Sequence, residues 1–155
     1  MSEKPSSFTL RDAQPGDLET IVAFNLALAR DTESLSLDPQ VLRAGVARLL
    51  ADSAKGFYVV ATDGARVIGQ IMVTYEWSDW RDGNWWWLQS VYVAPDARRQ
   101  GVFRALFDEV RGRAKRQGAC GLRLYVEREN HVAQGTYSGL GMKRAPYFVY
   151  QLGEE

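Results

Sequence analysis

The 155-residue sequence contains very few thiol and imidazole groups, because it has one cysteine, Cys120, and one histidine, His131. A single cysteine cannot form a disulfide within the chain, which is typical of proteins from reducing compartments. One histidine without a cysteine cluster excludes the usual zinc sites, so we expect no metal. Cys120 precedes an apolar stretch and is interpreted as a small buried residue.

The sequence also lacks a long apolar run and an excess of either charge. No apolar stretch approaches the roughly 18 residues that a membrane-spanning helix needs. The N-terminal residues MSEKPSSF lack the apolar centre of a signal peptide, so we expect a cytoplasmic protein without membrane contacts. The 19 basic and 19 acidic residues balance, which disfavours a general nucleic-acid-binding protein.

The spacing of apolar residues predicts an α+β fold that follows a disordered lead over residues 1–7. Helical spacing covers residues 17–29, a segment that opens at Asp38-Pro39, the stretch after Gly101, and residues 130–140. Asp63-Gly64 predicts a hairpin turn. The expected strands cover residues 8–11, 57–62, 66–77, 85–93, 122–127 and 147–152.

Residues 91–104, VYVAPDARRQGVFR, are the most informative stretch of the sequence. A short apolar strand leads to Pro95, and an amphipathic pattern begins after Gly101. This order predicts a strand, a tight glycine-containing loop and the start of a helix. Such a loop presents backbone N–H groups at the positive end of the helix dipole, which favours a phosphate group.

The spacing of Arg98, Gly101 and Phe103 resembles motif A of the GNAT (Gcn5-related N-acetyltransferase) superfamily, R/Q-x-x-G-x-G/A. In that family the loop holds the pyrophosphate of acetyl-coenzyme A (acetyl-CoA). Phe103 departs from the pattern, because the family usually has glycine or alanine there. A helix that has already begun can direct this side chain into the core.

Residues 121–142 resemble a second GNAT motif, in which N-x-x-A-x-x-x-Y precedes L-G-M/F. The matching residues are Asn130, Ala133, Tyr137, Leu140 and Gly141. The resemblance implies that Asn130 contacts the cofactor and that Tyr137 protonates the departing thiolate. A phenol with a free pKa of about 10 can act as this general acid for a thiol with a pKa of about 8.5. The alternative is a core tyrosine in a capped helix.

The resemblance implies one domain over residues 8–155, with a mixed, mostly antiparallel central sheet flanked by helices and strands that splay at the cofactor cleft. It also implies acetyl-CoA as the cofactor, and direct attack on the thioester by a primary amine of a small molecule or peptide. The backbone N–H of Val91 would polarise the thioester carbonyl. The implied cofactor-binding residues are Val91, Val93, Arg98, Arg99, Gln100, Gly101, Val102, Phe103, Asn130, Ala133 and Tyr137.

A base must deprotonate the attacking amine, and Glu76 and Glu33 are preferred among five candidate carboxylates, which also include Asp79, Asp82 and Glu127. Glu76 lies near the end of an expected strand, and Glu33 lies in the expected loop between the first two helices. Gln89 cannot act as a base, but it is placed to orient the acceptor or a water molecule. The rival hypothesis is a non-catalytic module that binds acyl-CoA as a sensor or an interaction partner.

Five tryptophans lie close together in the sequence, at positions 77, 80, 85, 86 and 87. In a strand, Trp85 and Trp87 point to one face and Trp86 to the other. At least one face is therefore expected in the core. The remaining rings have three interpretations, which are an acceptor pocket, an interface between two copies of the chain, and a stacking surface for single-stranded nucleic acid.

Overall fold

The computed structural model describes residues 7–153 and divides the chain into two compact units, one that ends at Tyr125 and one that begins at Val126. The expected disordered lead lies outside the described residues except for Ser7, which is exposed and in no helix or strand. A single domain over residues 8–155 stays a prediction.

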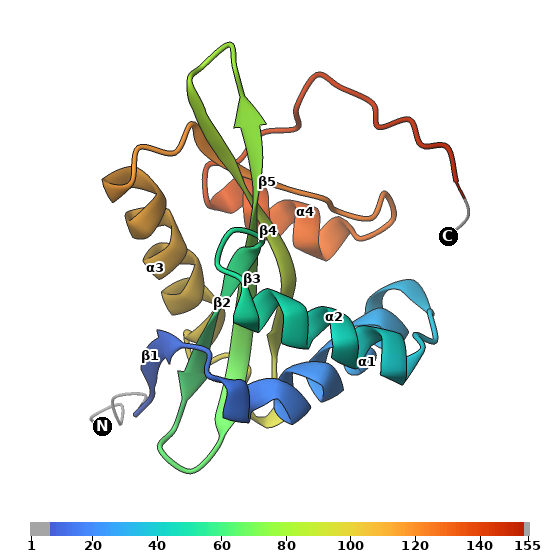
Figure 1. Ribbon diagram of the computed structural model, residues 1–155, viewed down its shortest axis with the longest axis vertical. Coiled ribbons are helices and arrows are strands. Elements are labelled where there is room, and N and C mark those ends of the chain that lie inside the picture. The colour runs from blue at the N-terminus through green and yellow to red at the C-terminus, as the bar shows by residue number, and fades with distance from the viewer. Residues whose placement is uncertain (1–6, 154–155) are drawn as a thin grey trace. The chain divides into compact units, whose positions relative to one another are not determined.

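Over residues 7–125, the first unit is an open five-stranded sheet with three α-helices, drawn in Figure 1. The strands follow the order β1-β2-β3-β4-β5; the first three neighbouring pairs are antiparallel, and β4 and β5 are parallel. This mixed sheet confirms the expected α+β fold. The strands are β1 (Thr9–Asp12), β2 (Gly56–Thr62), β3 (Val67–Ser78), β4 (Gly83–Val93) and β5 (Gly121–Leu124), and the helices are α1 (Leu18–Glu33), α2 (Pro39–Ala51) and α3 (Val102–Arg116).

Helix α1 is longer than its apolar stripe predicts, because it continues past Ala29 to Glu33. Its last turn is polar and exposed, so apolar periodicity gives no signal there. The Thr32 hydroxyl donates to the Leu28 carbonyl at 2.7 Å, and the helix ends at Ser34 in the left-handed conformation. Glu33 is therefore the last residue of α1, and the expectation that it lies in the following loop is wrong.

The helix start predicted at Asp38 and the hairpin turn predicted at Asp63 are both confirmed. The Asp38 carboxylate accepts from the Gln40 N–H at 2.9 Å and caps α2. The Asp63 carboxylate accepts from the N–H groups of Ala65 and Arg66, each at 2.9 Å, in the hairpin turn between β2 and β3. These local bonds fix where α2 starts and where the chain reverses.

The helices cover the two faces of this sheet. In Figure 1, α1 and α2 lie on one face and α3 lies on the other. The layer formed by α1 and α2 packs on Tyr58 of β2 through Ile21, Val22 and Val46. The buried stripe of α3 begins at Val102, whereas Phe103 is only half-buried; the stripe consists of Val102, Leu106, Phe107, Val110 and Ala114.

The second unit contains α4 (His131–Gly139). Gly141, which follows the end of this helix, adopts the left-handed conformation, as the Leu140-Gly141 pair predicts. The predicted strand over residues 147–152 is not formed, since residues 143–152 belong to no helix or strand. The strand predicted over residues 122–127 also ends early, at Leu124. A strand needs a neighbouring strand to complete its hydrogen bonds, so aromatic and β-branched composition alone does not create one.

No helix within residues 7–153 combines the length and the apolar composition that crossing a membrane requires.

Gly69 allows the first turn of α3 to pack directly on β3. A Cβ at this position would lie 2.8 Å from Cγ1 of Val102 and 3.4 Å from Cδ1 of Leu106. Val102 is β-branched and fully buried, so it cannot move aside easily. We therefore expect Gly69→Ala to lower the free energy of unfolding by about 1–3 kcal/mol, as overpacking does. Urea denaturation measures this change.

The matched control is Gly45→Ala in α2, where a new Cβ would meet nothing within 4 Å. Alanine in a helix interior should raise the free energy of unfolding by about 0.5–1 kcal/mol. Equal stability of the Gly69→Ala variant and the wild type would show that the contact with α3 is not tight.

Candidate active site

The loop between β4 and α3 presents backbone N–H groups that the helix itself does not use. Arg99 and Gly101 both have positive φ values, 63° and 83°. Helix α3 starts at Val102 with no side-chain cap, and its first helical bond runs from the Ala105 N–H to the Gly101 carbonyl at 3.0 Å. The preceding N–H groups point out of the first turn, where the helix dipole is positive. This arrangement suits a phosphate group.

Arg98 ties this loop to the end of β4. Its Nε donates to the Val93 carbonyl at 3.0 Å, and its guanidinium lies 5.5 Å from the centre of the Tyr92 ring. Within residues 7–153 its terminal nitrogens make no further hydrogen bond, so they remain available to an anion. Arg99 and Gln100 are exposed, and Gln100 Nε2 donates to the Asp96 carbonyl at 3.3 Å.

The Phe103 ring lies near another ring of its own helix. Its ring centre lies 6.2 Å from that of Phe107, one turn further along α3. Val102 takes the buried position at the start of the helix. A large side chain is therefore compatible with a helix that begins at residue 102.

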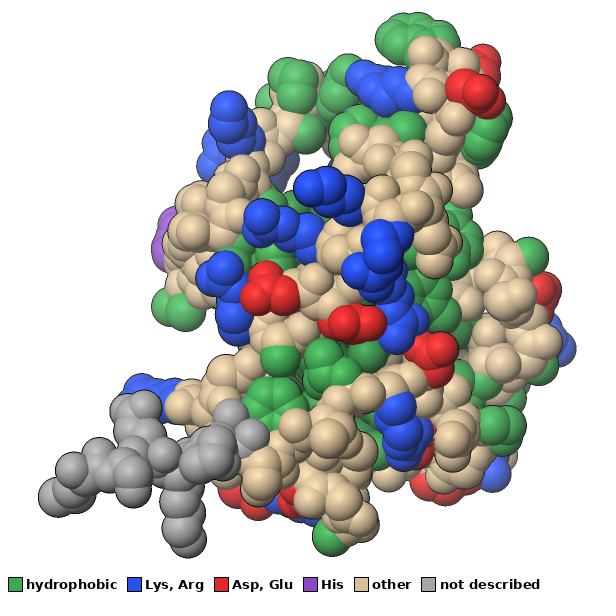
Figure 2. All heavy atoms as spheres, turned by 90° about the vertical axis from the view of Figure 1, so that its left-hand side faces the viewer, with side chains coloured by type: hydrophobic (Ala, Val, Ile, Leu, Met, Phe, Trp, Pro, Cys, Tyr) green, Lys and Arg blue, Asp and Glu red, His purple; other side chains and the backbone are tan. Residues whose placement is uncertain are grey.

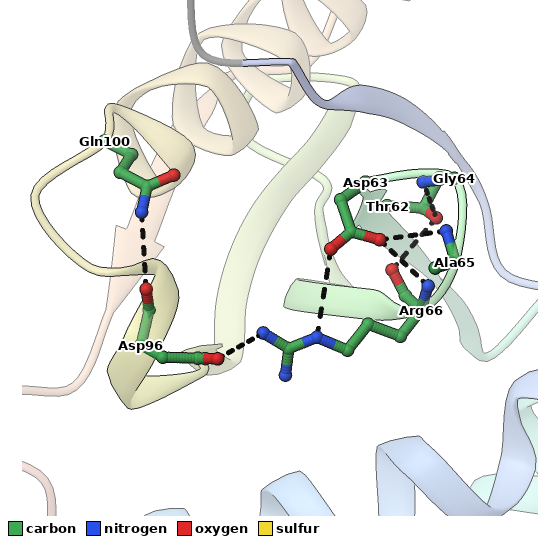
Figure 3. Close-up of polar contacts among 7 residues, drawn as sticks. All are labelled: Thr62, Asp63, Gly64, Ala65, Arg66, Asp96 and Gln100. Atoms are coloured by element: carbon green, nitrogen blue, oxygen red, sulfur yellow. Dashed lines mark hydrogen bonds and ion pairs between the residues drawn. The ribbon is translucent and has the colours of Figure 1, made fainter.

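Figure 3 shows a second tie, between the loop and the β2–β3 hairpin. Arg66 Nη2 donates to Asp96 Oδ2 at 2.5 Å, and Arg66 Nε lies 3.8 Å from Asp63 Oδ2. The Arg66 hydrogen bond lowers the pKa of Asp96, and backbone N–H groups of the turn, chiefly that of Arg66, lower the pKa of Asp63. Both carboxylates are therefore ionised at neutral pH, and Arg66 links the hairpin to the turn that precedes Arg98.

Basic side chains gather on the face of the sheet that carries α3, as Figure 2 shows. Some of them are neutralised: Arg104 pairs with Asp108 at 3.1 Å, and Arg113 pairs with Glu109 at 2.9 Å and with Asp12 at 2.6 Å. Arg113 also lies over the Phe57 ring, 5.5 Å from its centre. Arg113 therefore packs between α3 and the sheet, and its charge does not serve the loop.

Strand β4 is paired with β5 over only part of its length. The parallel pairing joins Trp85–Leu88 to Gly121–Leu124 and then stops. Among the described residues of the first unit, residues 89–93 of β4 have no strand neighbour on that side. The expected splay is therefore present, and Val91 and Val93 lie along the open edge.

A bulge interrupts β4 at the start of this open segment. The pairing with β3 shifts between Gln70↔Tyr92 and Met72↔Gln89, and Ser90 has a φ of 50°. Such bulges redirect backbone groups and are frequent beside active sites. The bulge lies one residue before Val91.

Buried polar side chains lie behind the bulge. Gln70 is fully buried, and its Nε2 donates to Asn25 Oδ1 at 3.2 Å and to the Ser90 carbonyl at 3.0 Å. Asn25 Nδ2 donates to the Tyr58 hydroxyl at 3.1 Å. Burial raises the pKa of Tyr58, and this effect outweighs the hydrogen bonds from Asn25 and Ser90. Gln70 Oε1 has no hydrogen-bond partner among the described residues, which costs about 1–3 kcal/mol.

Sequence reasoning missed Gln70, although a signal was present. It is the one polar side chain within the otherwise apolar segment from Val67 to Val73. A polar residue that interrupts a buried strand needs a partner, and here the partner is a backbone carbonyl. Arg66 was missed because its partner, Asp96, is thirty positions away in the sequence.

The two candidate bases differ in their surroundings. The Glu76 carboxylate accepts from Trp87 Nε1 at 3.0 Å and pairs with Arg123 at 3.2 Å. Glu33 is exposed at the end of α1. Gln89, expected to orient the acceptor, donates to the Thr74 hydroxyl at 2.6 Å.

The tryptophans divide between core and surface. Trp86 is buried and packs edge-on against Phe57 and Tyr75, with ring centres 5.4 and 5.7 Å apart. Trp85 stacks under Arg123, 3.8 Å from its ring centre. Trp77 and Trp80 remain 61% and 88% exposed. The core interpretation is therefore confirmed for Trp86.

In the second unit, Asn130 caps α4 as expected, because its Oδ1 accepts from the Ala133 N–H at 3.1 Å. The side-chain oxygen of Asn130 therefore serves to cap the helix. Burial raises the pKa of Tyr137, so its phenol carries a proton throughout the neutral range.

Comparisons with known proteins agree with this architecture. A model of the "Acetyltransferase (GNAT) family" matches residues 23–142. A possible acetyltransferase from Clostridium difficile 630 is 44% identical, with a TM-score of 0.91 and coverage of 97% of this chain and 99% of that chain.

More distant structures show the fold alone. A predicted acetyltransferase with acetyl-CoA from Clostridium acetobutylicum is 14% identical, with a TM-score of 0.78 and coverage of 94% of this chain and 96% of that one. A GCN5-related N-acetyltransferase from Ralstonia eutropha JMP134 is 18% identical, with a TM-score of 0.76 and coverage of 94% and 98%. No curated protein matches the sequence.

The Arg66–Asp96 pair should order the loop before α3. Replacing Asp96 by asparagine weakens this tie, so we expect amide hydrogen exchange in residues 97–103 to accelerate by about two- to fivefold, as an exposed ion pair allows. NMR measures the exchange. The control is Glu19→Gln, which weakens an exposed ion pair with Arg43 between α1 and α2 and should leave the loop unchanged. Unaltered loop exchange in Asp96→Asn would refute the ordering role.

Proposed function

Since the chain belongs to the GNAT family of acetyltransferases, we propose that it moves the acetyl group of acetyl-CoA to a primary amine by direct attack on the thioester. Acetyl-CoA is the cosubstrate of the family. The observation that carries the proposal is the uncapped start of α3, with Arg98 and Arg99 beside it and an open β4 edge leading to it. The acceptor is a small molecule or a peptide.

The residues of the first unit fit the cosubstrate. The N–H groups from Gly101 to Phe103 suit its pyrophosphate, with Arg98, Arg99 and Gln100 supplying further donors. The open edge at Val91 and Val93 suits the amides of its pantetheine arm, which can pair like an added strand. The second motif adds three further residues to the proposed cosubstrate site, namely Asn130, Ala133 and Tyr137.

The reaction needs an electrophile, a proton acceptor and a proton donor. Bound acetyl-CoA supplies the thioester carbonyl. The Val91 N–H stabilises the negative charge that develops on the carbonyl oxygen as the amine nitrogen bonds to carbon. Tyr137 donates its proton to the sulfur as the carbon–sulfur bond breaks, and the raised pKa ensures that this proton is present.

Glu33 and Glu76 are the proposed acceptors of the amine proton. The oxygens of Glu76 are already engaged, one by Trp87 Nε1 and the other by Arg123. Glu33 has an exposed carboxylate, which an acceptor amine can reach directly or through water. The contacts therefore favour Glu33 over Glu76.

Calorimetric titration with acetyl-CoA tests the cosubstrate site. We expect micromolar or tighter binding, and weaker binding of dephospho-CoA. Replacing Arg98 and Arg99 together by alanine should weaken binding about tenfold or more, because each charge-assisted bond to phosphate contributes about 1.5–3 kcal/mol.

The matched control removes two positive charges from the other end of α3, by replacing exposed Arg111 and Lys115 with alanine. Its affinity should stay close to that of the wild type. No binding by the wild type would reject the proposed function, and equal losses in both variants would mean that only net charge matters. Binding without release of free thiol from any amine tested would support the acyl-CoA-binding module instead.

Tyr137→Phe tests the general acid. We expect kcat to fall about 10²–10⁴-fold, the usual contribution of such a group, while the affinity for coenzyme A changes little. Thiol-release kinetics with a reactive amine and titration with coenzyme A provide the two measurements. An unchanged kcat would remove Tyr137 from the mechanism, and a loss confined to affinity would make it a binding residue.

A further inference from the structure

We propose that Gln70 is a positioning residue that aims the Val91 N–H at the acetyl carbonyl by holding the peptide group between Ser90 and Val91. The inference rests on the proposed function, and it adds a residue that neither sequence motif contains. Gln70 acts through the backbone of β4 and does not touch the substrate.

The first step of the argument is the conformation of Ser90. Its φ of 50° lies in the left-handed region, which a serine without local support rarely adopts. The pairing of β3 with β4 slips at the same place. This conformation therefore needs a contact that holds it.

Gln70 supplies such a contact at the Ser90 carbonyl, whereas the Ser90 side chain bonds to Tyr58. Gln70 Nε2 donates at 3.0 Å to the Ser90 carbonyl and at 3.2 Å to Asn25 Oδ1. The Ser90 backbone carbonyl can only accept, so the amide nitrogen of Gln70 must face it. Asn25 is anchored in turn by its bond to the Tyr58 hydroxyl. The Gln70 side chain thus has one orientation.

The planarity of the peptide bond transmits this orientation to Val91. In a trans peptide the carbonyl and the N–H point in opposite directions. Gln70 Nε2 holds this peptide by its carbonyl, from the face of the sheet where Asn25 of α1 lies. Because the Ala94 N–H donates to the Ile68 carbonyl of β3, alternation along β4 places the Val91 N–H on the edge away from β3. On that side, the described part of the first unit provides β4 with no strand neighbour beyond Leu88. The N–H is therefore directed to the edge where the proposed thioester lies.

The unsatisfied oxygen of Gln70 is consistent with this role. Gln70 Oε1 is buried without a hydrogen-bond partner among the described residues, which lowers stability. An apolar residue of similar size would avoid this cost, but it could not hold the carbonyl of Ser90. The buried oxygen is therefore a structural cost that accompanies the hydrogen bond to Ser90.

Gln70→Met removes both donors and keeps the side-chain volume. We expect kcat to fall by about tenfold or more, because the Val91 N–H no longer lies where charge develops. The affinity for coenzyme A, which has no thioester, should stay within about threefold of the wild type, since a positioning effect acts in the transition state. The carbonyl stretch of isotope-labelled bound acetyl-CoA should shift back toward its value in water.

The matched control is Val59→Ala on the neighbouring strand β2. Val59 is fully buried, pairs with Ile71 and makes no hydrogen bond to Ser90 through its side chain. This variant should lose stability and retain kcat and the carbonyl shift. If both variants lose kcat equally, or if Gln70→Met retains it, the positioning role is refuted.

One measurement on the wild type works even if Gln70→Met does not fold and even if the proposed function fails. The Val91 amide of the ligand-free protein should exchange with solvent at least about tenfold faster than the amide of Val73, which lies in the central strand β3. A protected Val91 amide would overturn the inference. Absence of acetyl-CoA binding with a rapidly exchanging Val91 amide would instead reject the proposed function and leave the peptide orientation supported.

Discussion

The architecture of the first unit depends on the interruption of β4 at Ser90. Before this bulge, β4 is a central strand with β3 on one side and β5 on the other. After it, β3 is the one strand neighbour that the described part of the first unit provides, and β4 ends beside the loop that starts α3. The bulge and the early end of β5 together leave an open strand edge next to an uncapped helix start, and this combination supports the proposed site for a cosubstrate with a pyrophosphate.

The contacts around this strand all hold the loop and the bulge in place. Gly69 lets Val102 approach β3 closely, which fixes where α3 begins. Arg98 and Arg66 tie the loop from two directions, one to the Val93 carbonyl and one to Asp96. Backbone groups that are rigid before a ligand arrives lose less entropy on binding, so these ties favour recognition of an anion. The basic surface over α3 is largely separate from this task, because Arg113 and Arg104 are occupied by carboxylates on their own or neighbouring elements.

Local signals in the sequence predicted much of the fold. Asp38-Pro39, Asp63-Gly64 and Leu140-Gly141 mark their turns and helix ends through bonds within a few residues, so they could be read directly. The start of α3 after Gly101 followed from the same logic, and the family match confirms the resemblance seen in Arg98, Gly101 and Tyr137. Two predictions failed where a distant partner decides the outcome. The segment 147–152 has strand composition but forms no strand, and β5 ends at Leu124 because pairing, and not composition, sets its length.

By itself, the sequence determined the order of the elements as far as α4, the family, and the strand–loop–helix segment whose backbone suits a phosphate, since each of these is encoded by residues close together in the chain. Only the tertiary structure decided which side chains form hydrogen bonds that hold the backbone of the site. Gln70, Asn25 and Tyr58 come from β3, α1 and β2, and they meet at Ser90 only because the helix packs on that face of the sheet. Arg66 likewise finds Asp96 only after the β2–β3 hairpin and β4 have paired. A polar residue within an apolar strand indicates that its side chain needs a hydrogen-bond partner. Which residue becomes that partner depends on the register and packing of strands that are distant in the chain.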